Sequence, residues 1–283
     1  MSTLKRIASC AVLALMLGAP GAMAEESPTV TIDTGALQGA TENGMNVYKG
    51  VPYAAPPVGP LRWKPPQPPA SWEGVRDATK FTLPCPQVGI TDLNPESTDE
   101  DCLHLNVFTP EEPGKNLPVM VWIHGGALIQ GAGSDAMYTP INLVKQGVIV
   151  ITIDYRLGAL GYFAPQQLID EAAAAGELVG NYGTMDQIES LKWVKRNIAA
   201  FGGDPNNVTI FGQSGGGRTV TWLMTSPEAR GYFQKAIALA ARQNPLPDMT
   251  QSVHGMRSQV DDAAGFIQSL GVTSMEELRA LPT

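Results

Sequence analysis

The sequence has 283 residues, a formal net charge of −8 and a pI near 4.9. A net negative protein is a poor ligand for nucleic acid and for anionic lipid, because both carry negative charge themselves. With 43% hydrophobic and 16% charged residues, the composition is that of an ordinary globular protein that buries a sizeable core.

Residues 1–24 have the layout of a secretory signal peptide. Lys5 and Arg6 precede a short apolar run, and Ala22-Met23-Ala24 offers a small-residue cleavage site. The run is too short to span a bilayer, and no later stretch approaches the ~18 apolar residues of a membrane helix. We therefore expect a secreted or periplasmic protein of residues 25–283, cleaved near Ala24. Cleavage removes two cations and no acid, which changes the net charge from −8 to −10.

Cleavage would also remove Cys10 and leave Cys85 and Cys102. An even pair in an exported protein indicates one disulfide, whose loop of about 17 residues is worth ~3 kcal/mol in the chain-entropy estimate. Two free thiols are the alternative. The residues around Cys10 resemble a lipoprotein cleavage box, but the apolar run follows Cys10 instead of preceding it, so we favour export.

Residues 51–69 are rich in proline. Proline donates no backbone hydrogen bond and blocks helix interiors, which predicts an extended surface arm. Four large apolar side chains are spaced through this region as packing anchors. They are Tyr53, Leu61, Trp63 and Trp72.

Beyond the arm, strand patterns alternate with helix patterns. Residues 103–109 alternate apolar and polar side chains, which predicts a strand with one wet face. Residues 118–123 and 148–153 are nearly continuous apolar runs, typical of strands that are buried on both faces of a parallel sheet. Residues 188–201 carry apolar side chains at steps of three or four, which predicts an amphipathic helix that ends at Gly202-Gly203.

The same alternation continues towards the end of the chain. Residues 207–211 form another short apolar run, residues 215–224 suit a helix, and residues 236–240 begin a further apolar run. Strand–helix order of this kind predicts an α/β fold with right-handed crossovers, a mostly parallel sheet and helices on both faces.

Gly212-Gln213-Ser214-Gly215-Gly216 matches the G-x-S-x-G pattern directly between the predicted strand and helix. A strand-to-helix turn this tight strains the serine backbone and exposes its Oγ above the sheet, as in a nucleophile elbow. Glycines are needed on either side, because larger side chains would collide with the neighbouring strand and helix. We therefore predict that Ser214 is a catalytic nucleophile; a glycine-rich turn with a solvated serine is the alternative.

A second glycine-rich stretch supports this interpretation. Residues 122–127 read Trp-Ile-His-Gly-Gly-Ala after a buried strand and resemble the H-G-G-G loop that supplies oxyanion-hole amides. Acyl transfer needs such donors where the negative oxygen develops. The candidate donors are the backbone N–H groups of Gly126, Ala127 and Gly215.

The sequence has three histidines. We expect His124 to pack or hydrogen-bond locally, and we assign no role to His104 or His254. No histidine–carboxylate spacing resembles a zinc site and no phosphate-binding glycine loop is present, so we expect neither a metal nor a cofactor.

Several ordered motifs together resemble the type-B carboxylesterase/lipase family, which includes the cholinesterases. The resemblance covers about residues 28–280. Beside the elbow and the H-G-G stretch, the matching segments are residues 48–54, 56–63, 100–107, 154–158 and 201–205.

This resemblance implies an α/β-hydrolase fold and hydrolysis of small-molecule carboxylic esters through a serine acyl-enzyme. It implies that Cys85 and Cys102 close the family's first disulfide loop. It also implies structural ion pairs between Arg62 and Glu100 and between Arg156 and Asp186.

The chain departs from the family pattern beside the nucleophile and in the oxyanion loop. Gln213 and Gly215 replace the usual Glu and Ala of G-E-S-A-G, which removes a charge next to Ser214. Ala127 stands at the third glycine of the oxyanion loop, and Leu128 follows where Phe is usual. Ala127 still offers its N–H, and we expect its methyl to narrow the space around the reacting carbonyl.

Length is the largest departure. Family members are about twice as long, and their triad order is Ser, then an acid, then His. We therefore expect the acid and the histidine outside this chain, which would be truncated after the elbow region and inactive as it stands. The alternative is that His254 serves as the base, oriented by Glu228 or Asp248.

Two other functions remain open. Some proteins of this fold have lost catalysis and act in binding or adhesion, and an amidase or acyltransferase would use the same serine. Neither the oligomeric state nor the ester cleaved can be inferred from these residues.

Overall fold

The computed structural model describes residues 27–87, 97–242 and 247–283. The predicted signal peptide, its cleavage site and Cys10 lie outside the described residues.

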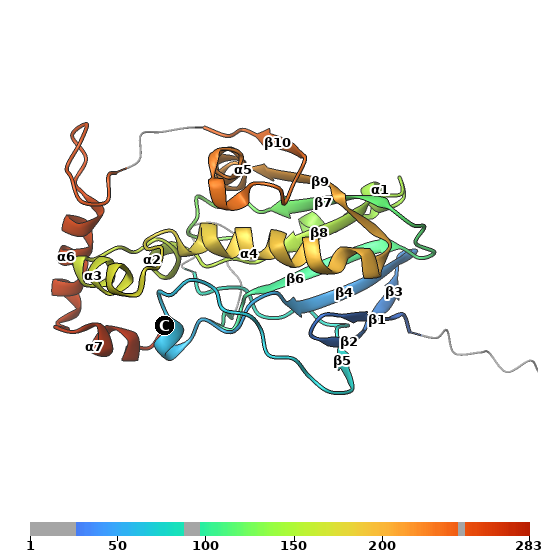
Figure 1. The fold of residues 1–283 in the computed structure, drawn as a ribbon, viewed down its shortest axis with the longest axis horizontal. Coiled ribbons are helices and arrows are strands. Elements are labelled where there is room, and N and C mark those ends of the chain that lie inside the picture. Colours follow the sequence, from blue (N-terminus) through green and yellow to red (C-terminus); the bar gives the residue numbers. More distant parts are fainter. Residues whose placement is uncertain (1–26, 88–96, 243–246) are drawn as a thin grey trace, which may run out of the picture.

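A seven-stranded sheet forms the centre of the fold, in the order β10-β9-β7-β8-β6-β4-β3 (Figure 1). Its strands are β3 (Ala40–Glu42), β4 (Met45–Pro52), β6 (His104–Pro110), β7 (Leu117–Ile123), β8 (Ile149–Ile153), β9 (Gly203–Gln213) and β10 (Lys235–Leu239). The pairs from β10 to β8 are parallel, and the pairs from β8 to β3 are antiparallel. The sheet that was predicted to be mostly parallel is therefore mixed, with parallel pairing in one half and antiparallel pairing in the other. A separate small sheet holds β1 (Thr29–Ile32), β2 (Gly35–Gln38) and β5 (Val75–Asp77).

Helices lie on both faces of the large sheet, as predicted. The helices of the described residues are α1 (Ile141–Val144), α2 (Gly158–Gly161), α3 (Gln166–Ala175), α4 (Tyr182–Asn197), α5 (Gly215–Thr225), α6 (Gln259–Leu270) and α7 (Met275–Ala280). Helices α6 and α7 lie beyond one end of the sheet in Figure 1. Buried side chains of α4 and α5 join the main core on one face, and α4 runs across that face in Figure 1. The short α1 packs over β6 and β8 on the other face. None of the helices in the described ranges has the length and apolar character of a membrane span.

The two apolar runs predicted to be buried strands differ in the structure. All five residues of β8 are buried. In β7, Val119, Val121 and Ile123 are buried in the main core, whereas Met120 and Trp122 on the opposite face are only half-buried. The prediction of burial on both faces is thus confirmed for β8 and wrong for β7, because α1 lies over β8 and β6 on that second face.

The prediction of one wet face for residues 103–109 is wrong. Strand β6 is buried almost throughout, because Leu105 and Val107 join the main core on one face and Phe108 packs with Val144 of α1 on the other. Its polar Asn106 has partners there: Nδ2 donates to Thr152 Oγ1 at 3.0 Å, and Oδ1 accepts from the Gly50 N–H at 3.0 Å. Burying a polar side chain costs little free energy when its hydrogen bonds are satisfied in this way. The alternation of apolar and polar residues was therefore not enough to predict an exposed face.

The proline-rich arm is anchored as predicted by Tyr53 and Trp63, which are both buried. The Tyr53 hydroxyl donates to the Asp154 carbonyl at 2.6 Å, and Trp63 Nε1 donates to the Ala159 carbonyl at 2.8 Å. These bonds fasten the arm to the segment that follows β8.

Both predicted ion pairs are present. Arg62 Nε donates to Glu100 Oε2 at 2.9 Å. Arg156 and Asp186 form a bidentate pair that is buried on both sides, with Nε–Oδ2 and Nη2–Oδ1 distances of 2.8 and 2.7 Å. The Arg156 backbone N–H also donates to Asp186, so this carboxylate fixes the turn after β8 to helix α4.

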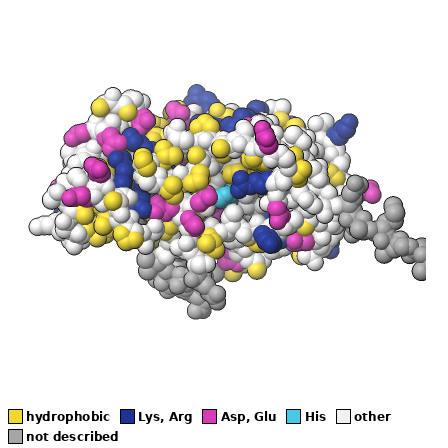
Figure 2. Space-filling model, turned by 90° about the horizontal axis from the view of Figure 1, so that it is seen from below, with side chains coloured by type: hydrophobic (Ala, Val, Ile, Leu, Met, Phe, Trp, Pro, Cys, Tyr) yellow, Lys and Arg dark blue, Asp and Glu magenta, His cyan; other side chains and the backbone are white. Residues whose placement is uncertain are grey.

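Charged side chains of both signs are interspersed with apolar ones on the face shown in Figure 2. On this face, Lys and Arg do not gather into a broad basic patch of the kind that tracks a nucleic-acid backbone.

We predict that Asp186→Asn lowers the free energy of unfolding by about 3–5 kcal/mol, because it leaves the buried Arg156 guanidinium without its counter-charge. The matched control is Asp33→Asn, which removes a partner of the exposed Arg196 and is expected to cost at most about 1 kcal/mol. Urea unfolding of both variants measures the difference. Equal losses in the two variants would show that burial of the Arg156 pair is not what matters.

Candidate active site

Strands β7 and β9 are parallel neighbours, with Ile123 opposite Gly212. The next residues along each strand begin the two glycine-rich segments singled out in the sequence. One is the stretch of residues 124–131, called the glycine loop below. The other is the elbow around Ser214. Because carboxyl ends of parallel strands meet at one edge of a sheet, this register places the glycine loop beside the elbow.

Ser214 occupies the turn between β9 and α5. Its backbone has φ 56° and ψ −118°, and its side chain is exposed. Its N–H donates to the Leu239 carbonyl of β10 at 3.0 Å, and its carbonyl accepts from the Arg218 N–H at 2.9 Å. A left-handed φ is costly for a residue other than glycine and is typical of functional sites. The structure thus has the strained strand-to-helix turn that the sequence predicts.

The elbow glycines are required by close packing of main chain on main chain. A Cβ on Gly216 would lie 2.0 Å from the Ile123 carbonyl oxygen, and one on Gly212 would lie 2.6 Å from the Gly216 carbonyl carbon. Both distances are far inside van der Waals contact. A side chain at Gly216 would push α5 away from β7, and one at Gly212 would push α5 away from β9, as predicted from the motif.

The glycine loop touches the elbow directly. A Cβ on Gly125 would lie 3.4 Å from Ser214 Cβ, and a Cβ on Gly215 would lie 3.0 Å from the Ala127 nitrogen. The structure therefore brings Ser214, Gly215 and Ala127 together. Gly126, the third predicted donor, adjoins Ala127 with φ 101°.

The two departures from the family pattern meet at this contact. A methyl on residue 215 would press against the Ala127 amide at 3.0 Å, and this chain has glycine there and its methyl on residue 127 instead. Ala127 and Leu128 have φ of 56° and 68°, which costs about 1–3 kcal/mol for each such residue. The loop therefore has left-handed backbone at two positions that are not glycine, although glycine adopts this conformation most easily.

The structure gives His124 and His104 structural surroundings. His124 is fully buried, its ring stacks on Tyr155 at 4.3 Å, and Nδ1 lies 2.8 Å from the Gly125 carbonyl. Burial lowers the pKa of His124 to about 4, so the ring is neutral at pH 7. Burial also lowers the pKa of His104, which lies in β6. Neither ring reaches Ser214 by a hydrogen bond.

His254 does not complete a triad in the described part of the chain. It is exposed, and no hydrogen bond joins it to Glu228, Asp248 or Ser214. Asp248 instead accepts from the backbone N–H groups of Thr250 and Gln251. The alternative in which His254 is the base has no geometric support among these residues.

The structure also joins Cys85 to Cys102 in a disulfide, as predicted. Both cysteines are buried, and Cys102 lies two residues before the start of β6. Nowhere in residues 27–87, 97–242 and 247–283 do three or more His, Cys, Asp or Glu side chains cluster as a metal ion would require.

Sequence reasoning missed two residues behind the glycine loop. The Asp154 carboxylate is buried and accepts from the Gly133 N–H at 2.8 Å, just past the loop. Burial raises the pKa of Asp154 to about 7, although the Gly133 hydrogen bond opposes the shift. The Gln87 side chain hydrogen-bonds to Gly131 at the end of the loop. Asp154 was noticed only as the first residue of a family motif, and Gln87 was not singled out from the sequence at all.

Comparisons with known proteins agree with this geometry. The model of the carboxylesterase family matches residues 26–279. The chain belongs to the carboxylesterase family. The para-nitrobenzyl esterase of Bacillus subtilis (strain 168) is 46% identical over 250 residues, which are 86% of this chain and 48% of that protein. The fumonisin B1 esterase of Sphingopyxis macrogoltabida is 39% identical over 274 residues, covering 93% of this chain and 50% of that protein.

Solved structures of carboxylesterases share the fold. A PNB esterase structure superimposes with a TM-score of 0.79 at 41% identity, covering 90% of this chain and 51% of that one. A juvenile hormone esterase from Manduca sexta, with OTFP covalently attached, gives a TM-score of 0.80 at 30% identity, covering 91% and 49%. The predicted α/β-hydrolase fold is confirmed. The chain spans about half the length of the relatives it matches.

We predict that Asp154→Asn removes part of the pH dependence of stability. The native pKa of about 7 lies above the ordinary 3.8, so the unfolded chain releases a proton that the native state retains between those values. The wild type therefore loses stability as pH rises from about 4 to about 7, by up to about 4 kcal/mol at ~1.4 kcal/mol per pKa unit. The variant has no proton to lose there.

Urea unfolding of wild type and Asp154→Asn at pH 4 to 8 measures this effect. The variant should gain stability relative to the wild type as pH rises. The exposed Asp262→Asn is the control and should show no such trend. A constant difference between wild type and Asp154→Asn across this range would contradict the burial argument.

Proposed function

We propose that this chain forms the nucleophile-bearing part of a serine carboxylesterase that hydrolyses small-molecule esters, with Ser214 as the nucleophile. The observation that supports the proposal is the contact between the glycine loop and the strained elbow, in which Gly125 lies against Ser214 and the Ala127 amide lies against Gly215. Membership of the carboxylesterase family and the named esterase relatives support the same reaction.

In this mechanism Ser214 Oγ attacks the ester carbonyl carbon while a base takes its proton. The carbonyl electron pair moves onto oxygen, where the N–H groups of Gly126, Ala127 and Gly215 stabilise the negative charge. The tetrahedral intermediate collapses, the alcohol leaves with the proton, and an acyl-enzyme remains. Water then repeats the attack and releases the acid.

The start of helix α5 is a further source of stabilisation for the negative oxygen, in addition to the three backbone N–H groups. Ser214 precedes the first turn of α5, and the amino end of a helix carries partial positive charge. A negative oxygen forming above Ser214 would therefore lie near both the loop amides and the start of the helix.

We place the triad acid and histidine in sequence outside this chain. Two observations support this proposal: no described histidine hydrogen-bonds Ser214, and the relatives are about twice as long. The same protein is proposed to be exported after cleavage near Ala24, because residues 1–24 have the signal-peptide pattern and a Cys85–Cys102 disulfide suits an oxidising compartment.

We predict that a fluorophosphonate labels Ser214 in the protein expressed from its complete reading frame. Ser214→Ala should abolish labelling and lower kcat on short-chain p-nitrophenyl esters by about 10⁴-fold or more, because the acyl-enzyme can no longer form. Ser226→Ala, at the far end of α5, is the matched control and should retain both.

The same assay separates the other functions. A binding or adhesion protein would show neither labelling nor turnover, and an amidase would turn over the matched anilide faster than the ester. Either result, or labelling that persists in Ser214→Ala, would overturn the proposed function.

A further inference from the structure

The glycine loop folds back on itself before it leaves the site. The Gly126 carbonyl accepts from the N–H groups of Ile129 and Gln130 at 3.0 and 3.1 Å. Gly131 then packs onto the start of the loop, because a Cβ there would lie 2.4 Å from His124 Nδ1. Residue 131 must therefore be glycine, and it has no side chain of its own with which to fix the end of the loop.

Gln87 supplies that fixation from another part of the chain. Its Oε1 accepts from the Gly131 N–H at 2.7 Å, and its Nε2 donates to the Gly131 carbonyl at 2.9 Å. The side chain thus pairs with both polar groups of one peptide residue, as a neighbouring strand would. In the described part of the chain, these are the hydrogen bonds that Gly131 makes.

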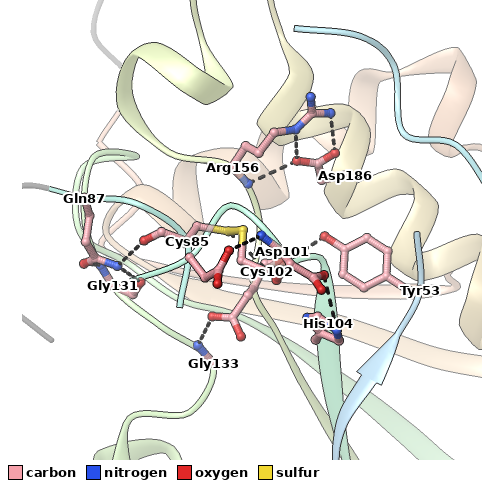
Figure 3. Close-up of a disulfide and its surroundings, with 12 residues drawn as sticks. Tyr53, Cys85, Gln87, Asp101, Cys102, His104, Gly131, Gly133, Arg156 and Asp186 are labelled. Carbon is pink, nitrogen blue, oxygen red and sulfur yellow. Dashed lines mark hydrogen bonds and ion pairs between the residues drawn. A yellow bond between two sulfur atoms is a disulfide. The ribbon is translucent and has the colours of Figure 1, made fainter. Parts of the chain in front are cut away.

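Gln87 is itself firmly anchored. Its Nε2 also donates to the Cys85 carbonyl at 3.1 Å, and Cys85 is joined to Cys102 by the disulfide (Figure 3). Cys102 is buried and leads into β6, which pairs with β4 and β8 inside the large sheet. A covalent and hydrogen-bonded connection therefore runs from the sheet through the disulfide to the end of the glycine loop.

We propose that Gln87 is a positioning residue that holds the glycine loop, and with it the Ala127 amide, against Ser214. The loop needs an external hold because Ala127 and Leu128 have left-handed backbones that are unfavourable for these residues. Without Gln87, the end of the loop relaxes and the amide moves away from the place where the oxyanion forms. The kinetic part of this proposal rests on the proposed function, whereas the structural part does not.

Gln87→Met tests the structural part, since methionine has nearly the same size but cannot form the two hydrogen bonds that the Gln87 side chain makes with Gly131. Hydrogen exchange of the Gly131 amide in the full chain should become at least about tenfold faster, because a hydrogen-bonded amide gains its protection from the bond that is lost. Gln67→Met is the matched control. Gln67 makes the same kind of bond, from Nε2 to the carbonyl two residues earlier, but it is exposed and should leave Gly131 unchanged.

If Gln87→Met does not fold, a second variant can be measured in its place. Gln87→Glu retains the acceptor for the Gly131 N–H and loses the two donated bonds, so the exchange rate should lie between wild type and Gln87→Met. Exchange at Gly131 within twofold of wild type in every folded Gln87 variant would overturn the proposal.

Kinetics on the protein from its complete reading frame test the consequence for catalysis. Gln87→Met should lower kcat by about tenfold and change KM by less than about twofold, since an oxyanion donor acts mainly in the transition state. A rise in KM with unchanged kcat would overturn the positioning role. If the wild type turns over no ester, the proposed function fails, and the exchange measurement alone decides whether Gln87 holds the loop.

Discussion

The parallel pairing of β7 with β9, with Ile123 opposite Gly212, is the constraint on which the site depends. Any other register would move the glycine loop along the sheet relative to Ser214. The main chains after these strands come so close that Gly212 and Gly216 have no room for a side chain. Close packing of the main chain, more than any single side-chain contact, therefore sets the distance between the nucleophile and its proposed oxyanion donors.

That closeness also explains why the departures at residues 127 and 215 belong together. Where the two segments touch, Gly215 leaves the space that a methyl would need beside the Ala127 amide. Ala127, which stands where the family has glycine, has a left-handed backbone. Strain of this kind persists only where surrounding structure over-determines it. The register below the loop and the Gln87 and Asp154 hydrogen bonds behind it provide that support.

The sequence predicted the features that local patterns encode. The elbow was recognisable because Gly-x-Ser-x-Gly, an apolar strand and a helix follow one another within a few residues. The burial of Asn106 was not recognisable, because its hydrogen-bond partners lie on the neighbouring strands β8 and β4. Gln87 was missed for the same reason: its partner Gly131 lies 44 residues away and contributes only backbone atoms. Aspartate side chains are usually exposed, and only the fold shows that Asp154 is buried.

The most direct test of this account is a crystal structure of the complete protein after reaction with an organophosphonate. We predict that phosphorus is bonded to Ser214 Oγ, with the phosphonyl oxygen about 2.7–3.1 Å from the amide nitrogens of Ala127 and Gly215. The glycine loop should keep its contact with Gly215 in that complex. A phosphonate attached elsewhere, or a phosphonyl oxygen that faces away from both amides, would contradict the account.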